Sequence, residues 1–129
     1  MSSTELIDLA ANQSITITSP SYPGNYQNNL DIEWFIQTAE DFRILLSFHA
    51  FNTESGNDYL VVGNGRDSTD SSTWVILGSG SSLPPDTLST GNAMWLRFTS
   101  DGVITKSGFS LSARSVESLG KSTLNEVKH

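Results

Sequence analysis

The chain of 129 residues contains no cysteine. This absence excludes disulfides, thiolate nucleophiles and zinc sites built from cysteine, so stability must come from packing alone. A chain of this length buries roughly two thirds of the surface of its unfolded state, which is enough for a fold without covalent staples. Its length and its 36% of hydrophobic residues fit one globular domain.

Positive charge and long apolar runs are also scarce. Seven Lys and Arg stand against fourteen Asp and Glu, which gives a formal net charge of -7. Phosphate backbones and anionic lipid headgroups repel such a chain, so we expect no nucleic-acid partner. The longest apolar runs, such as Tyr59–Val62 and Trp74–Leu77, are far below the ~20 residues that cross a bilayer as a helix, so we expect no membrane span.

The residue patterns of common enzymes are missing as well. The two histidines lie at a strand end (His49) and at the last position (His129), which disfavours a Ser-His-Asp triad. The tripeptide at 120–122, Gly-Lys-Ser, lacks the glycine five residues earlier that a phosphate loop needs. Glu54 and Asp58 offer a carboxylate pair, but many loops carry such pairs without any glycosidase chemistry. We therefore expect no enzymatic activity.

Apolar residues instead recur with period two, and each such stretch ends in Gly, Pro, Asn, Asp or Ser. This pattern is typical of antiparallel β-strands. The alternating stretches are 14–18, 30–36, 42–48, 93–98 and 109–113, and the runs 59–62 and 74–77 are apolar on both faces. Two packed sheets would bury all of these sets, so the sequence predicts an all-β, antiparallel two-sheet β-sandwich of about seven or eight strands.

The predicted sandwich covers residues 15–114. Residues 1–14 are expected to form an N-terminal extension, whose Asn12-Gln13-Ser14 is a glycosylation sequon that matters only in a secretory pathway. Residues 115–129 have scattered apolar residues and balanced charge, which predicts a C-terminal tail or a marginal helix.

Three acids occur in loops that a sandwich can bring to one end. Glu54 and Asp58 bound a Gly-containing loop, and Asp101 follows the strand that ends at Phe98. Converging carboxylates repel one another by several kcal/mol unless they are protonated or hold a hard cation such as Ca²⁺. Spacing alone leaves two alternatives open, a cation site or three exposed turn formers.

Five sequence blocks follow one another along the predicted sandwich. They are Ser19–Tyr26, Trp34 with Ile36, Phe51–Glu54 leading to Asp58–Leu60, Phe98–Asp101, and Gly108–Phe109. In this order the blocks resemble the signature of a CUB domain. The resemblance extends from Ile15 to Ala113 and implies an extracellular β-sandwich of the jelly-roll type that acts as a non-enzymatic binding module, with other domains of a parent protein possible.

The resemblance also implies a calcium site. In similar CUB domains the positions of Glu54, Asp58 and Asp101 ligate Ca²⁺, and a backbone carbonyl just after the Ser-Asp pair, here that of Val103, contributes a further oxygen. The position of Tyr22 supports these acids through its hydroxyl, so Tyr22 is the expected outer partner of the ligating set.

Two departures distinguish this chain from the family pattern. Ile32 and positions near Gly56 and Ser79 stand where family members usually carry disulfide cysteines. Burial of one or two large aliphatic side chains can match the typical 2–4 kcal/mol of one disulfide. The spacing from Glu54 to Asp58 is also short, and Gly56 suits the sharp turn that this spacing needs.

Two binding functions follow from the resemblance. In the first, a calcium-organised acidic loop site recognises Lys or Arg side chains of a protein partner through the ligating acids and Tyr22. In the second, the domain is a carbohydrate-binding module in which exposed Tyr22, Tyr26 or Trp74 stack on sugars. Trp34 and Trp95 are expected to be structural.

Overall fold

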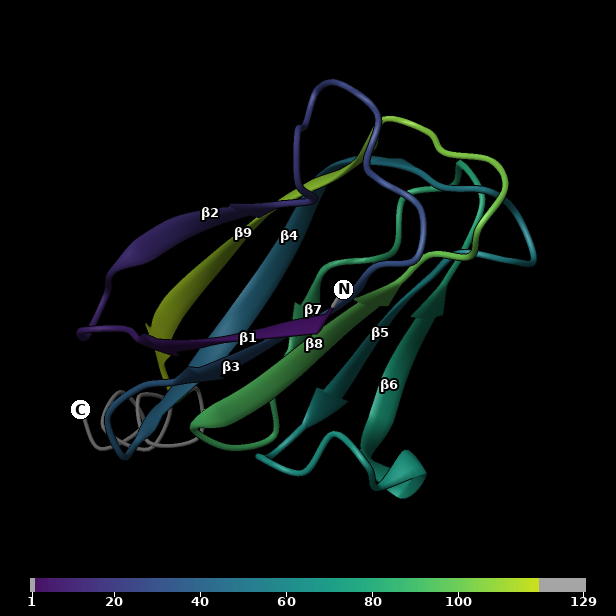
Figure 1. Ribbon diagram of the computed structural model, residues 1–129. Helices are drawn as coiled ribbons and strands as arrows, with labels where there is room; N and C mark the ends of the chain where they lie inside the picture. The colour runs from purple at the N-terminus through teal and green to yellow at the C-terminus, as the bar shows by residue number, and fades with distance from the viewer. Residues whose placement is uncertain (1, 119–129) are drawn as a thin grey trace, which may run out of the picture.

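The computed structural model describes residues 2–118, which form two sheets packed face to face (Figure 1). Every strand pair is antiparallel except β1, which runs parallel to β3. The all-β two-sheet sandwich is therefore confirmed. The first sheet has the order β1(Ser2–Asp8), β3(Asp31–Gln37), β8(Ala93–Thr99), β5(Tyr59–Asn64), β6(Trp74–Gly78), and the second β2(Ser14–Thr18), β9(Gly108–Glu117), β4(Phe42–Asn52), β7(Thr87–Leu88).

Alternation along the strands directs one set of side chains into the space between the sheets. In β3 every second residue is buried, and Ile32 and Trp34 both belong to this core. Aromatic rings cross its centre edge to face, with Phe109 in contact with Trp34 and with Phe98. The structural role expected for Trp34 is confirmed, and Ile32 packs in the core at a position where the family usually has cysteine.

The two ends of the sandwich differ from the predicted boundaries. Residues of the expected N-terminal extension form β1, which pairs with β3 from Ser2 to Asp8, so they belong to the first sheet. Nearly all side chains of β1 are exposed, which explains why its sequence lacks an apolar alternation. Strand β9 continues to Glu117, opposite Phe42, and residues 119–129 of the predicted tail lie outside the described residues.

The run Trp74–Leu77 is not buried on both faces as predicted. It forms β6, the last strand of the first sheet, and only Ile76 points into the core. Trp74, Val75 and Leu77 are exposed. Trp74 and Leu77 line a groove with Tyr59 on the outer side of the sheet, which no other layer covers. Among the described residues, η1 (Ser71–Thr73) is the one helical element, and no helix there has the length and apolarity that a membrane crossing requires.

Gly63 of β5 lies directly under the indole of Trp95. The two residues are cross-strand partners, and a Cβ atom added to Gly63 would lie 2.3 Å from Cζ2 of Trp95. Trp95 is fully buried on the outer side of the first sheet, where the indole Nε1 donates to Thr73 Oγ1 at 3.3 Å. The expected structural role of Trp95 is thus confirmed, and it depends on the missing side chain at Gly63.

We expect Gly63→Ala to lower the free energy of unfolding by about 1–3 kcal/mol, because the added methyl overpacks against a rigid indole. Urea denaturation followed by circular dichroism measures this change. Gly91→Ala is the matched control, since its Cβ would meet no atom within 4 Å, and it should change stability by no more than about 0.5 kcal/mol. Equal effects of the two substitutions would contradict the packing explanation.

Candidate metal centre

Three loops meet at one end of the sandwich and bring three acids together. Glu54 follows β4, Asp58 directly precedes β5, and Asp101 follows β8. One carboxylate oxygen from each lies within 4.8 Å of the others. Asp58 is fully buried, whereas Glu54 and Asp101 are half-buried. The alternative in which all three are exposed turn formers is therefore wrong for this structure.

The short Glu54 to Asp58 spacing is accommodated by a tight turn. The backbone N–H groups of Asn57 and Asp58 both donate to the Glu54 carbonyl, at 3.2 and 3.0 Å. Gly56 has a φ of 81°, a left-handed conformation that glycine adopts without strain. Ser79 Oγ accepts from the Gly56 N–H at 2.9 Å and lies 2.8 Å from the Asp58 carbonyl oxygen. Hydrogen bonds thus join the regions where the family usually places a disulfide.

Asp58 is held by two donors from distant parts of the chain. The Tyr26 hydroxyl donates to Oδ2 at 2.6 Å, and the Asp101 backbone N–H donates to Oδ1 at 2.9 Å. Tyr26 is 1% exposed, and its hydroxyl also accepts from the Glu54 N–H at 3.1 Å. Burial and then the bond to Asp58 raise the pKa of Tyr26 above its ordinary value, so the phenol stays a donor.

Tyr26 therefore has the role that the sequence assigned to Tyr22. Both tyrosines belong to the loop between β2 and β3, but the ring of Tyr26 packs edge to face against Phe98, with centroids 4.9 Å apart. Tyr22 is half-buried, and no hydrogen bond among the described residues joins its hydroxyl to one of the three acids. The prediction for Tyr22 as outer partner is wrong in this structure, because packing against the core selects Tyr26.

The electrostatics of the cluster are unfavourable without a counter-charge. Loss of solvent, and then repulsion from Asp101, raise the pKa of the Glu54 carboxyl above its usual range. Oε1 of Glu54 is buried and has no hydrogen-bond partner among the described residues. A buried carboxylate oxygen without a donor beside two further carboxylates fits a hard cation, because the cation would supply the missing charge and the missing contact.

Val103, the expected source of a further backbone oxygen, lies next to this cluster. Its backbone N–H donates to Asp101 Oδ1 at 3.2 Å, and its side chain is 72% exposed. This hydrogen bond orients the Asp101 carboxylate. Ligation by the Val103 carbonyl stays a prediction.

Comparison of the sequence with models of protein families identifies the family of this chain. The model of the CUB domain matches residues 7–112, so the chain belongs to the CUB domain family. The chain is 37% identical over 99 residues to bone morphogenetic protein 1 of Xenopus laevis and 37% identical over 97 residues to human tolloid-like protein 2. These matches cover 74% and 72% of the chain but 14% and 9% of the two relatives, so the chain spans a small part of their length.

Solved CUB structures have the same architecture. The human MASP-1/3 CUB1-EGF-CUB2 structure matches with a TM-score of 0.74 and 22% identity, over 85% of this chain and 40% of that one. The MASP-1 CUB2 domain bound to Ca²⁺ matches with a TM-score of 0.70 and 26% identity, over 81% and 96% of the two chains. CUB domains are non-catalytic interaction modules of extracellular proteins, which agrees with the binding class expected from the sequence.

We expect Tyr26→Phe to lower the free energy of unfolding in EDTA by about 1–3 kcal/mol, because it leaves Asp58 Oδ2 and the Glu54 N–H without their partner. Thermal and urea unfolding measure the change. Tyr22→Phe removes the same atom from the same loop and should stay within about 0.5 kcal/mol of the parent protein. A larger loss from Tyr22→Phe would contradict the assignment.

Proposed function

We propose that this chain is a calcium-organised binding module that recognises basic side chains of a protein partner in an extracellular setting. The observation that carries the proposal is the buried Oε1 of Glu54, which has no hydrogen-bond partner within residues 2–118 and lies beside the carboxylates of Asp58 and Asp101. The donor set consists of oxygen atoms, which is the chemistry that Ca²⁺ prefers. Other domains of a parent protein are part of the proposal, since the relatives are far longer than this chain.

Ca²⁺ takes 6–8 oxygen ligands at roughly 2.3–2.6 Å, so the three acids fill only part of its coordination. The Val103 carbonyl and water would complete it. Tyr26 holds Asp58 in place through the bond to Oδ2, so the orientation of this carboxylate is already fixed when the ion binds. The ion would relieve the repulsion that raises the pKa of Glu54 and would fix three loops before a partner arrives.

The acids keep a negative balance after the ion binds. Three carboxylates outweigh the two charges of Ca²⁺, so the rim attracts a cationic side chain. A Lys or Arg side chain of a partner can donate hydrogen bonds to the outward lone pairs of the ligating carboxylates. The formal net charge of -7 speeds the association with a basic partner.

We expect opposite effects of Glu54→Gln without and with calcium. The raised pKa means that the folded protein binds this proton more tightly than the unfolded chain, so ionised Glu54 destabilises the fold above that pKa. In EDTA at pH 7 the variant should therefore melt at a higher temperature than the parent protein. This difference should vanish as the pH falls and Glu54 becomes protonated.

With millimolar Ca²⁺ the order should reverse, because the parent protein gains stability from the ion and the variant loses a ligand. Titration calorimetry should show a Ca²⁺ affinity reduced by at least about tenfold in Glu54→Gln and by about 10–100-fold in Tyr26→Phe. Absence of any Ca²⁺ heat up to millimolar concentration, with an unchanged melting temperature, would contradict the calcium site.

A trilysine peptide tests partner recognition. Nonspecific attraction to an acidic protein weakens when Ca²⁺ reduces the net charge, whereas recognition by ordered loops strengthens. We expect trilysine to bind more tightly with Ca²⁺ than with EDTA, and to lose affinity in Asp101→Ala and at high salt, where charges are screened beyond ~8–10 Å. Tighter binding in EDTA than in Ca²⁺ would contradict the proposed mode.

Carbohydrate binding is the second candidate function, and the exposure of Trp74 favours it. Trp74 is 43% exposed and, with Tyr59 and Leu77, lines a groove of about 380 Å³ on the first sheet. Tyr26 is buried and offers no surface for a sugar. A glycan array that gives strong binding resistant to EDTA and to Asp101→Ala, but abolished by Trp74→Ala, would favour this candidate over the first.

A further inference from the structure

Strand β6 is an open sheet edge that carries large apolar side chains. It pairs with β5 and ends the first sheet, as its position at the margin of the fold in Figure 1 shows. Trp74, Val75 and Leu77 are 43%, 47% and 59% exposed. The strand contains no charged residue and no proline. An edge of this kind is a template for pairing with another extended chain.

The other sheet edges have features that discourage such pairing. Strand β1, the opposite edge of the same sheet, carries exposed Glu5 and Asp8. In the second sheet, β7 has only two residues, and β2 exposes Ser and Thr side chains. Charged edge residues and very short edge strands are protective devices of natural sheets. Strands β2 and β6 both have five residues and no charge, but β6 is the described edge strand that exposes Trp, Val and Leu side chains.

Negative charge lies at both ends of β6. On its N-terminal side, Asp67 and Asp70 are exposed in the β5–β6 segment, and hydrogen bonds from Thr69 lower the pKa of Asp67, which keeps it ionised. At its C-terminal end, Ser79 Oγ lies 3.2 Å from the Glu54 carbonyl oxygen, which places this end beside the acidic cluster.

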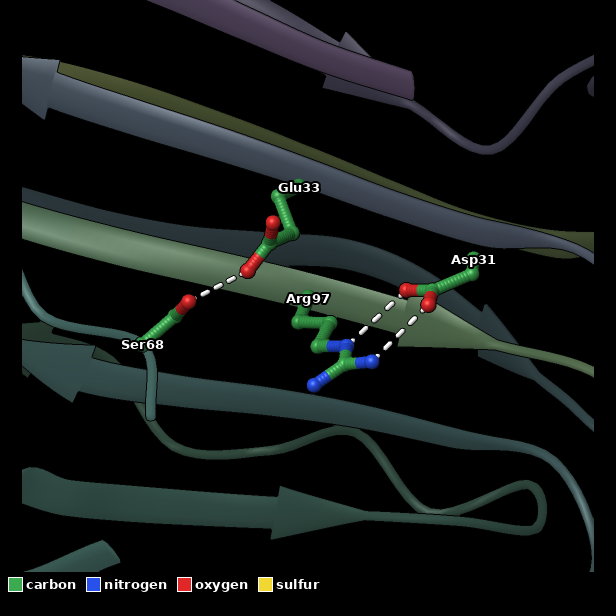
Figure 2. Close-up of polar contacts among 4 residues, drawn as sticks. All are labelled: Asp31, Glu33, Ser68 and Arg97. Atoms are coloured by element: carbon green, nitrogen blue, oxygen red, sulfur yellow. Dashed lines mark hydrogen bonds and ion pairs between the residues drawn. The ribbon is translucent and has the colours of Figure 1, made fainter. Parts of the chain in front are cut away.

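Two basic side chains of the first sheet and its β5–β6 segment have partners away from β6. Figure 2 shows Arg97 of β8 turned toward Asp31 of β3, with which it forms a two-bond ion pair at 2.9 and 2.8 Å. Arg66 lies 3.4 Å from Gln37 on the side of the sheet away from β6. The hydroxyl of Ser68, in the β5–β6 segment, donates to the carboxylate of Glu33 in β3 (Figure 2). Because β8 lies between β3 and β5, this bond holds the segment against the outer face of the sheet.

We infer that β6 docks an extended segment of a basic partner, which adds to the first sheet as a further strand. Backbone pairing would supply affinity along the edge, and apolar side chains at alternate positions of the segment would contact Val75 and Leu77. Lys or Arg residues on both sides of that apolar stretch would face Asp67 and Asp70 at one end and the acidic cluster at the other. The inference does not depend on calcium, because three carboxylates remain negative in sum with or without the ion.

A synthetic peptide tests the edge directly. The probe has the sequence Lys-Lys-Val-Thr-Val-Thr-Val-Lys-Lys, with both threonines N-methylated so that only one of its edges can pair. Titrated into the isotope-labelled full chain in Ca²⁺ and in EDTA, it should shift the amide signals of Trp74–Gly78 in both conditions. A peptide with Glu in place of every Lys should bind at least about tenfold more weakly, because its ends face like charges.

Matched variants locate the contact on the protein. Leu77→Ser should weaken binding by about tenfold through loss of apolar contact. Leu6→Ser changes a residue that is 79% exposed on the opposite edge of the same sheet and should leave the affinity unchanged. N-methylation of the three valines as well should abolish binding, because it removes the donors that pair with β6.

Three results of the peptide titrations would overturn the inference. These are the absence of saturable binding up to about 5 mM in both conditions, equal affinity for the Lys and Glu peptides, and shifts centred on β1. Sedimentation that shows a dimer of this chain formed through β6 would assign the edge to a second copy and overturn it as well. A failed calcium titration with intact peptide binding would contradict the calcium proposal alone.

Discussion

The arrangement of the loops depends on the need to compensate the buried carboxylate of Asp58. A fully buried acid is stable only if other groups replace its lost water. Here the hydroxyl of Tyr26 and the backbone N–H of Asp101 do so, one at each oxygen. These two bonds tie the β2–β3 loop and the segment after β8 to the start of β5. A third bond, from the Glu54 N–H to the Tyr26 hydroxyl, joins Glu54 to the same network. The contacts that stabilise Asp58 therefore also bring three mutually repelling carboxylates together.

The absence of disulfides is met by different means in different parts of the fold. Ile32 contributes apolar packing between the sheets. Near Ser79 the substitute is polar: Thr53 N–H donates to the Gly80 carbonyl at 2.8 Å, and Gly80 N–H donates to Thr53 Oγ1 at 2.9 Å. Together with the bond from the Gly56 N–H to Ser79 Oγ, these contacts fasten the segment after β6 to the loop that carries Glu54. Hydrogen bonds therefore join these two segments in this chain, where other members of the family have a disulfide.

The strands with one buried face could be predicted from sequence, because burial imposes period two on their side chains. Strand β1 could not, since its exposed side chains leave no such signal, and β7 is too short to show one. The exposure of β6 could not be predicted either, because an apolar sequence does not reveal whether its strand lies in the middle or at the edge of a sheet. The exposed positions of Trp74 and Leu77 were therefore not predicted.

The candidate site was partly predictable. The three acids were found through their match to the family blocks, and the structure brings them together. The choice between Tyr22 and Tyr26 was not accessible, because both lie in one loop and only contact with Phe98 distinguishes them. The unpartnered oxygen of Glu54 depends on the three-dimensional surroundings of one atom, and no sequence pattern encodes that.

The unequal burial of the three tryptophans gives the molecule a built-in optical reporter. Trp34 and Trp95 are 5% and 0% exposed, whereas Trp74 is 43% exposed at the β6 edge. A water-soluble cationic quencher such as caesium ion, which the negative surface does not repel, therefore reaches one indole and spares the other two. The quenchable fraction of the intrinsic fluorescence reports the state of the β6 edge, and the unquenched fraction reports the integrity of the sandwich. One unlabelled sample thus distinguishes occupation of that edge from loss of the fold.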